Sequence, residues 1–242
     1  MRTCLQVHAE WLLTPERVGI HLPTGTAVAA DLHLGYDQAR IRAGDAVPIA
    51  PLEEQLAPLR QIILHHGIRR LAVAGDLVED ARCGEVVPRL LEWLANAQVE
   101  LVGIVPGNHD EGIRLNGAPL LAKRLSLGAW HVVHGDKRLP AGKVVQGHIH
   151  PMLRWSRHVA GPCYLVGSNR LILPAFTPDA SGIDVANDSR WREYRCCVIA
   201  GDSVLDLGEL RELGTCGKPR ASGRRGVRAY PRLTAGRTRA YQ

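Results

Sequence analysis

The sequence predicts an α/β protein whose two halves are built differently. From residue 27 to residue 110, short apolar runs typical of buried strands alternate with segments of helical periodicity, which favours α/β layering with some parallel strand pairing. From residue 130 to residue 207, runs typical of strands follow one another with little helix between them. In both halves several predicted strands end in aspartate, asparagine or histidine, and strand ends are where α/β proteins place their chemistry.

Length and composition are those of a soluble globular protein. The 242 residues are 45% hydrophobic and 22% charged, enough to bury one large core or two small ones. No apolar run approaches the roughly 18 residues of a membrane span, and the N-terminus lacks the apolar core of a signal peptide, so we expect a cytoplasmic protein. The six cysteines form no Cys-x-x-Cys pair, which favours buried thiols over disulfides or a zinc knuckle.

The first half of the chain opens with strands separated by turns. Short apolar runs predict strands over residues 5–7, 11–13, 18–22 and 27–30, and a loop rich in turn residues is expected over residues 34–51. Helical spacing follows over residues 52–66, where Pro58 predicts a kink or a division into two pieces. The remaining elements expected in this half are a buried strand over 71–74, an amphipathic helix over 86–97 and a buried strand over 101–105.

The second half is predicted to consist mostly of strands. After a candidate helix over residues 115–125, strands are expected over residues 130–133, 143–146, 163–166, 171–173, 195–199 and 204–207. A linker begins near Gly214, and the segment 214–242 is rich in Gly, Arg, Ala and Thr. We expect this segment to be disordered, because it buries too little apolar surface to offset chain entropy. The predicted organisation is a folded domain over residues 1–213 and a basic tail over residues 214–242.

Charge is divided unevenly between the domain and the tail. The whole chain carries a formal net charge of +6. The tail holds eight Lys or Arg residues and no Asp or Glu, so residues 1–213 carry a net charge of −2. Basic residues of this kind can neutralise nucleic-acid phosphates without reading sequence, although a solvated extension without function explains the composition equally well.

Five predicted strand ends carry side chains of the types that bind metal ions. Each follows an apolar run, and most lie beside glycine, which lets the backbone turn sharply. The residues are Asp31 and His33, Asp76, Asn108 and His109, His134, and His148 and His150. One such strand end alone is an ordinary turn, but five in series favour a dinuclear metal site. Carboxylate, amide and imidazole ligands without thiolate suit Mn²⁺, Fe or Zn²⁺, and differ from the all-oxygen ligand set of Mg²⁺.

Five short motifs occur along the chain in the order Asp-x-His, Gly-Asp, Gly-Asn-His-Asp, His-Gly and Gly-His-x-His. This order resembles the motif series of the calcineurin-like metallophosphoesterase superfamily. Within it the chain is similar to the SbcD-related branch, and closest to the DNA ligase-associated metallophosphoesterases, through residues 30–36, 42–48, 173–176 and 182–185. The resemblance covers roughly residues 5–207. It implies a four-layer α/β/β/α sandwich of two mixed β-sheets, with helices outside and the metals at one end of the sheets.

The resemblance also implies a role for each candidate residue. One metal ion would be held by Asp31, His33 and His150. The other would be held by Asn108, His134 and His148. Asp76 would bridge the two ions, and His109 would stay off them and protonate the leaving oxygen. Many members of the family carry a second aspartate, three residues after the bridging one, that orients the catalytic histidine. Here Glu79 stands at that position, and Asp80 is its rival as the partner of His109. A solvated acidic turn in which neither carboxylate contacts His109 is the alternative.

The activity implied by the resemblance is hydrolysis of phosphoric ester bonds. Two divalent metal ions are implied, Mn²⁺ first and Zn²⁺ or Fe as alternatives, with a metal-bridging hydroxide as the nucleophile. The implied substrate is a phosphodiester, as in nucleic acid, the implied partners are a DNA ligase and helicase of a repair system, and no membrane is involved. The alternative enzyme is a small-molecule phosphoesterase acting on cyclic or mononucleotides. A further alternative is that the protein is not an enzyme but a phosphate-binding or scaffold subunit without catalytic turnover.

Overall fold

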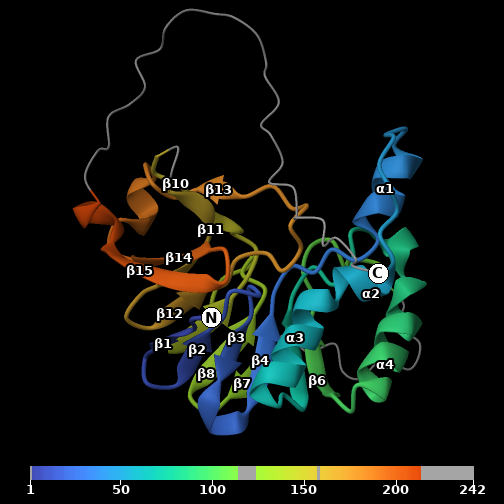
Figure 1. Cartoon of the computed structure of the whole chain (residues 1–242), viewed down its shortest axis with the longest axis horizontal. Helices are drawn as coiled ribbons and strands as arrows, with labels where there is room; N and C mark the ends of the chain where they lie inside the picture. The colour runs from blue at the N-terminus through green and yellow to red at the C-terminus, as the bar shows by residue number, and fades with distance from the viewer. Residues whose placement is uncertain (1, 114–123, 157–158, 214–242) are drawn as a thin grey trace, which may run out of the picture.

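Two β-sheets pack face to face, and α-helices cover the outer side of one of them (Figure 1). The computed structural model describes residues 2–113, 124–156 and 159–213. Three hydrophobic clusters correspond to three interfaces: helices against the first sheet, sheet against sheet, and the outer face of the second sheet. The predicted sandwich of two mixed sheets is confirmed.

The first sheet is ordered as along the chain, from β1 to β6. Its strands are β1 Leu5–Val7, β2 Trp11–Leu13, β3 Gly19–His21, β4 Thr26–Ala29, β5 Arg70–Ala74 and β6 Glu100–Val105. Strands β1 to β4 pair antiparallel, whereas β4, β5 and β6 pair parallel. The carboxyl ends of β4, β5 and β6 therefore lie at one edge of this sheet.

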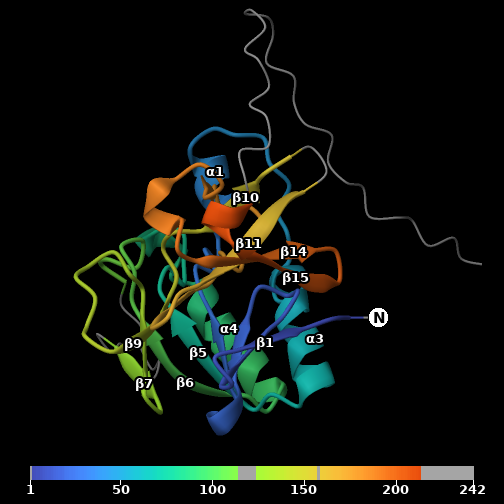
Figure 2. The ribbon, with the colours of Figure 1, turned by 90° about the vertical axis from the view of Figure 1, so that its left-hand side faces the viewer.

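The second sheet follows the order β13-β10-β11-β12-β9-β8-β7, and β14 pairs with both β11 and β15. Its strands are β7 Leu125–Leu127, β8 Trp130–Val133, β9 Lys143–Gln146, β10 Pro151–Arg154, β11 Ala160–Val166, β12 Arg170–Ile172, β13 Ile183–Asp184, β14 Arg195–Ala200 and β15 Ser203–Glu209. Here β8, β9 and β12 are parallel neighbours, so the ends of β8 and β9 also share an edge. Figure 2 views the molecule from the side of β14 and β15.

The helices of the described residues are short. They are α1 Tyr36–Arg42, α2 Leu52–Gln55, α3 Ala57–His66 and α4 Val86–Asn96, with the 3-10 turns η1 Leu22–Thr24, η2 Ala81–Cys83, η3 Ser189–Trp191 and η4 Leu210–Glu212. The division predicted at Pro58 is confirmed, because α2 ends and α3 begins just before this proline, which lies in the first turn of α3. The helix predicted over 115–125 lies outside the described residues except at its end, where Leu125 begins β7.

Alternation along the strands produces the layers. In β4, Ala27 and Ala29 belong to the cluster under the helices, whereas Val28 belongs to the cluster between the sheets. Strand β11 likewise turns Tyr164 towards the first sheet and Leu165 outward. Successive side chains of a strand point to opposite faces, so a strand buried on both faces is apolar throughout.

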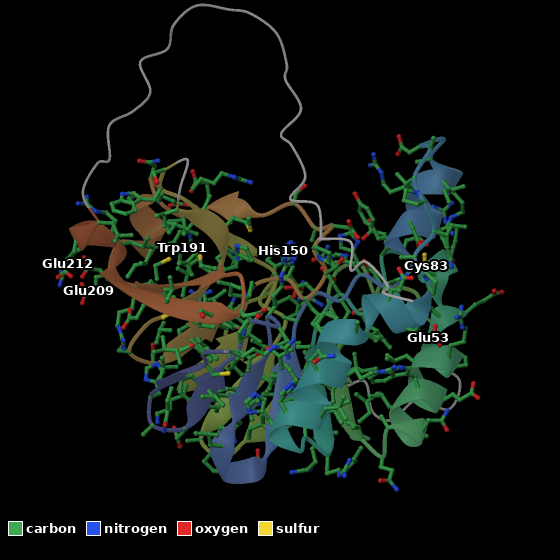
Figure 3. The ribbon with its side chains drawn as sticks, in the orientation of Figure 1. Glu53, Cys83, His150, Trp191, Glu209 and Glu212 are labelled. Atoms are coloured by element: carbon green, nitrogen blue, oxygen red, sulfur yellow. The ribbon has the colours of Figure 1, made fainter. Side chains whose placement is uncertain are left out.

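The outer layer of the second sheet is thinner than the helical layer of the first. Trp191 of η3 and Leu210 of η4 pack over the outward side chains of β11 and β14. Figure 3 shows Trp191 on this side of the molecule, away from the helices. The fourth layer of the sandwich is therefore built, in the described residues, from 3-10 turns and loops rather than from long α-helices.

Candidate metal centre

The polar strand ends of both sheets meet at one end of the sandwich. Asp31 follows β4 and Asp76 follows β5, at the shared edge of the first sheet. His134 follows β8 at the corresponding edge of the second sheet. The two edges are in contact, because His134 Nδ1 lies 3.3 Å from Asp31 Oδ1. Figure 3 shows His150 in the middle of the molecule, between the helical side and the side of β14 and β15.

Backbone hydrogen bonds fix these strand ends beyond the last residue of each strand. The Asp31 N–H donates to Gly75 O at 3.0 Å and the His33 N–H donates to Asp76 O at 2.9 Å. Five of the nine non-glycine residues with positive φ in the described chain are candidate ligands: Asp31, His33, Asp76, His148 and His150. This left-handed conformation costs about 1–3 kcal/mol at such residues and concentrates at functional sites.

One set of side chains, the first ligand group, comprises Asp31, His33, Asp76 and His150, whose ligand atoms all lie within 4.8 Å of one another. Asp31 Oδ1, His33 Nε2 and His150 Nε2 are buried without a hydrogen-bond partner. The opposite ring nitrogens are occupied: His33 Nδ1 lies 2.8 Å from Glu79 Oε2, and His150 Nδ1 lies 3.1 Å from Ser181 O. If each Nδ1 carries the proton, each Nε2 lone pair is free for a metal ion.

A second set, the second ligand group, comprises Asp76, Asn108, His134 and His148. Ligand atoms of Asp76, His134 and His148 lie within 4.8 Å of one another. His134 Nε2 is 3.1 Å from Asn108 Oδ1 and 3.1 Å from His148 Nδ1. This group therefore offers a carboxylate, an amide oxygen and two imidazoles around one point, with His134 buried and Asn108 exposed to solvent.

Asp76 is common to both groups. Its Oδ2 lies 3.8 Å from His33 Nε2 and 3.5 Å from His134 Nε2, so the carboxylate stands between the two sets of imidazoles. Its Oδ1 accepts a hydrogen bond of 2.9 Å from the His109 N–H. The position of this side chain is thus set by the Gly-Asn-His-Asp turn, and it suits a carboxylate shared by two ions.

The chemistry of the two groups fits divalent metal ions. Ligand atoms that share one ion at about 2.1 Å lie at most about 4.2 Å apart, so only a small contraction of each group is needed. Burial acts to raise the pKa of Asp31, but the close approach of the His134 and His150 rings, at 3.3 and 3.4 Å, outweighs it and holds that pKa below its ordinary value. Burial acts to lower the pKa of both histidines, and the Asp31 carboxylate outweighs it and raises each pKa. The centre therefore favours positive charge between these side chains.

His109 is placed beside the centre by a main-chain contact. Its Nδ1 lies 2.6 Å from the backbone oxygen of Glu79, and its side chain is 36% exposed. The Glu79 carboxylate lies 3.9 Å from His109 Nδ1, and its short contact is with His33. The expected hydrogen bond from the His109 ring to the Glu79 carboxylate is therefore replaced by one to the Glu79 backbone oxygen. The rival, Asp80, pairs instead with Arg42 at 2.9 Å and with Arg82 at 3.0 Å.

Asp110, the last residue of the Gly-Asn-His-Asp motif, holds two turns of the centre together. Its buried carboxylate accepts hydrogen bonds from the backbone N–H groups of Leu77, Val78 and Gly107. It thereby joins the turn after β6 to the turn after β5, which carry Asn108 and Asp76. Burial raises the pKa of Asp110. The acid that ends the Gly-Asn-His-Asp motif was the signal available in the sequence. The backbone oxygen of Ser181, which contacts His150 Nδ1, left no such signal.

Two other residues near motif ends, Arg170 and Asp136, have different surroundings. Arg170 donates to Gln146 Oε1 at 2.7 Å and its guanidinium lies 5.7 Å from the centre of the Trp191 ring, in the outer layer. Asp136 lines a cavity beside His134 and lies 3.8 Å from Lys137 Nζ.

Comparison with known proteins gives a match of fold. The crystal structure of Pseudomonas putida nuclease MPE matches with a TM-score of 0.64 and 17% sequence identity, covering 86% of this chain and 100% of that one. No protein-family model matches the sequence, and no curated protein matches it. Among the described residues, no helix has the length and apolar character required to cross a membrane. The chain therefore shares its fold with a nuclease and carries buried Asp/His groups that could hold metal ions.

Proposed function

We propose that this chain is a dinuclear metal-dependent phosphodiesterase that cleaves nucleic acid. The observation that carries the proposal is Asp76, a carboxylate common to two groups of ligand atoms at the meeting point of the two sheets. The unpartnered buried atoms of Asp31, His33 and His150 support a resident cation in the first ligand group. The motif order of the metallophosphoesterases and the fold shared with a nuclease support the reaction class.

In this proposal, the residues of the two ligand groups hold the metal ions that activate water and bind the phosphate. The two ligand groups would each hold one ion, Mn²⁺ first and Zn²⁺ or Fe as alternatives, because their nitrogen and oxygen donors suit these metals. Such ions supply a water of lowered pKa and neutralise charge on the phosphate. Asp31 and Asp76 bring two negative charges against the four positive charges of two divalent ions. The remaining excess of positive charge attracts a phosphodiester.

His109 is the proposed general acid. With Nδ1 held by the Glu79 backbone oxygen, Nε2 is the nitrogen left to meet the substrate. Its partly exposed side chain and the hydrogen bond of its backbone N–H to Asp76 support a position facing the substrate. Protonation of a leaving alkoxide by such a group contributes about 10²–10⁴-fold to the rate. A link to DNA ligase and helicase partners is proposed from the motif resemblance alone.

The test compares three substrates with Mn²⁺-loaded protein: bis-p-nitrophenyl phosphate, p-nitrophenyl phosphate and a single-stranded oligonucleotide. We expect turnover of both diesters, little turnover of the monoester, and loss of all activity in EDTA. His109→Ala should keep its metals and lose about 10²-fold or more on the oligonucleotide, whose alkoxide leaving group needs a proton. It should lose much less on bis-p-nitrophenyl phosphate, because p-nitrophenolate leaves without protonation.

Three outcomes would count against this function. Preference for the monoester would favour a small-molecule phosphoesterase, and failure of metal-loaded protein on every phosphoester would favour a scaffold subunit. An equal loss on both diesters in His109→Ala, with metals retained, would contradict the acid role. Metal content is measured in the same samples, so a damaged centre is recognised separately from a missing acid.

A further inference from the structure

A cavity of about 650 Å³ opens directly beside the metal centre at His134. Its walls are the end of β6, the connection between β8 and β9, and the residue that precedes β7. This volume lies within the range of sites for small organic ligands and gives room beyond a single phosphate group. A substrate whose phosphate reaches His134 therefore has space to continue into this cavity.

The charged residues of the cavity are mostly basic. Arg124, Lys137 and Arg138 line it, opposed by the single carboxylate of Asp136, which lies 3.8 Å from Lys137 Nζ. Neither Arg124 nor Arg138 has an ion-pair partner among the residues that the structure describes. The lining thus carries an excess of two positive charges, and two guanidinium groups are free to pair with phosphate oxygens in their bidentate geometry.

The rest of the lining is largely aliphatic. It comprises Val105, Pro106, Val133, Leu139 and Pro140. Such surfaces can pack against sugars and nucleobase faces, but they offer no side-chain hydrogen bonds to base edges. Cations that contact the phosphates bind an unpaired nucleic-acid strand without sequence preference, and here aliphatic side chains take the place of the aromatic rings on which bases commonly stack.

We propose that this cavity binds the nucleotides next to the scissile phosphate in a single strand of nucleic acid, with Arg124 and Arg138 contacting the following phosphates. The inference rests on the proposed function and narrows its substrate to a polynucleotide strand. A mononucleotide or cyclic nucleotide places its one phosphate at the metals and leaves both arginines without an anion. An unpaired strand supplies a phosphate for each of them and can turn its bases onto the aliphatic lining.

The experiment uses the full chain, an Arg124→Gln/Arg138→Gln double variant and a matched control. The control, Arg60→Gln/Arg89→Gln, removes the same charge from exposed positions on α3 and α4. Affinity for a fluorescent 12-nucleotide single strand is measured by anisotropy in EDTA over a range of KCl concentrations, which removes any contribution of bound metal. All forms keep residues 214–242, so any contribution of that segment is the same in each.

We expect the cavity variant to bind the strand at least about tenfold more weakly, because two charge-assisted hydrogen-bonding groups are removed. The slope of log affinity against log salt should fall by about 1.4, since each phosphate of a single strand that a cation neutralises adds about 0.7 to it. The control should keep the wild-type affinity and slope. With Mn²⁺, the cavity variant should keep wild-type turnover of bis-p-nitrophenyl phosphate and show a raised KM for the oligonucleotide.

Equal affinity and salt slope in the wild type and the cavity variant would overturn the inference, as would a wild-type chain that does not bind the strand at all. These results concern binding in EDTA, whereas the proposed function fails on turnover of bis-p-nitrophenyl phosphate. Failure of the cavity proposal and failure of the phosphodiesterase proposal are therefore separate observations.

Discussion

Glu79 contacts two histidines of the centre, one through its carboxylate and the other through its backbone oxygen. Its carboxylate lies 2.8 Å from His33 Nδ1, whereas its backbone oxygen lies 2.6 Å from His109 Nδ1. The first contact fixes the ring of a proposed metal ligand, and the second fixes the ring of the proposed acid. Carboxylate partners of this kind orient a ligating histidine and raise its basicity, and their removal costs about 10–100-fold in metal affinity.

Glu79→Gln is therefore expected to weaken Mn²⁺ binding by about 10–100-fold while leaving turnover at saturating Mn²⁺ close to wild type. The reason is that the contact with His109 is made by the backbone, which the substitution keeps. Calorimetric titration with Mn²⁺ and turnover of an oligonucleotide provide the two readouts. Asp80→Asn is the control, since Asp80 pairs with arginines outside the centre. Unchanged Mn²⁺ affinity with a large loss of turnover would instead assign the Glu79 carboxylate to His109.

For single residues, the sequence predicted which residues belong to the centre, but it did not predict which of their atoms are in contact. The motif resemblance implied that Glu79 lies near His109. It could not distinguish a side-chain contact from a main-chain one, since that depends on the path of the turn after β5. The same limit applies to Ser181, whose backbone oxygen contacts His150 from 31 residues away.

The elements that matter most are the turns after the parallel strands. Gly75 directly follows β5 with φ +86°, and a Cβ at this position would overlap the ring of His134 from the opposite sheet. Only a residue without a side chain lets the two sheets approach this closely while the backbone turns left-handed. Glycine here is a condition for bringing Asp76 and His134 together.

Gly75→Ala is expected to displace His134 and remove the ion of the second ligand group. Gly67→Ala, at the end of α3, is the matched control: it has φ +61° and nothing within 4 Å of an added Cβ. Both substitutions place alanine in a left-handed conformation, at a cost of about 1–2 kcal/mol that urea unfolding can measure. Only Gly75→Ala should lose bound Mn²⁺ by elemental analysis. Full metal content in that variant would show that His134 does not need this close approach.

Elements with an apolar pattern were predictable, and elements held by polar contacts were not. Helix α1 lies within the predicted loop 34–51, so the loop prediction was wrong there. Its only buried residue is Asp37, whose carboxylate accepts a hydrogen bond from the Ala50 N–H and closes the loop. No apolar stripe marks such a helix. Strands β10 and β13 were missed as well, because β10 begins with a proline and β13 has two residues.

The whole molecule places its chemistry where two sheets meet. One sheet supplies Asp31, Asp76 and Asn108, and the other supplies His134, His148 and His150. Alternating apolar residues explain why each sheet is buried, but they do not specify how the two sheets align. The face-to-face arrangement was predicted from the motif resemblance, and it is shared with a protein of 17% identity. The fold and the candidate centre were therefore predicted from two features of the sequence, the alternating apolar residues and the polar residues at the strand ends. The boundary near residue 214 and the basic tail remain predictions.

The most direct test of the shared carboxylate is anomalous diffraction from crystals of the Mn²⁺-loaded protein. The account predicts two peaks about 3.5–4 Å apart, one beside each ligand group and both in contact with Asp76. Asp76→Ala crystals, or elemental analysis of that variant in solution, should show the loss of at least one ion. A single peak in the wild type, two peaks that Asp76 does not join, or two full metal equivalents in Asp76→Ala would contradict the dinuclear centre.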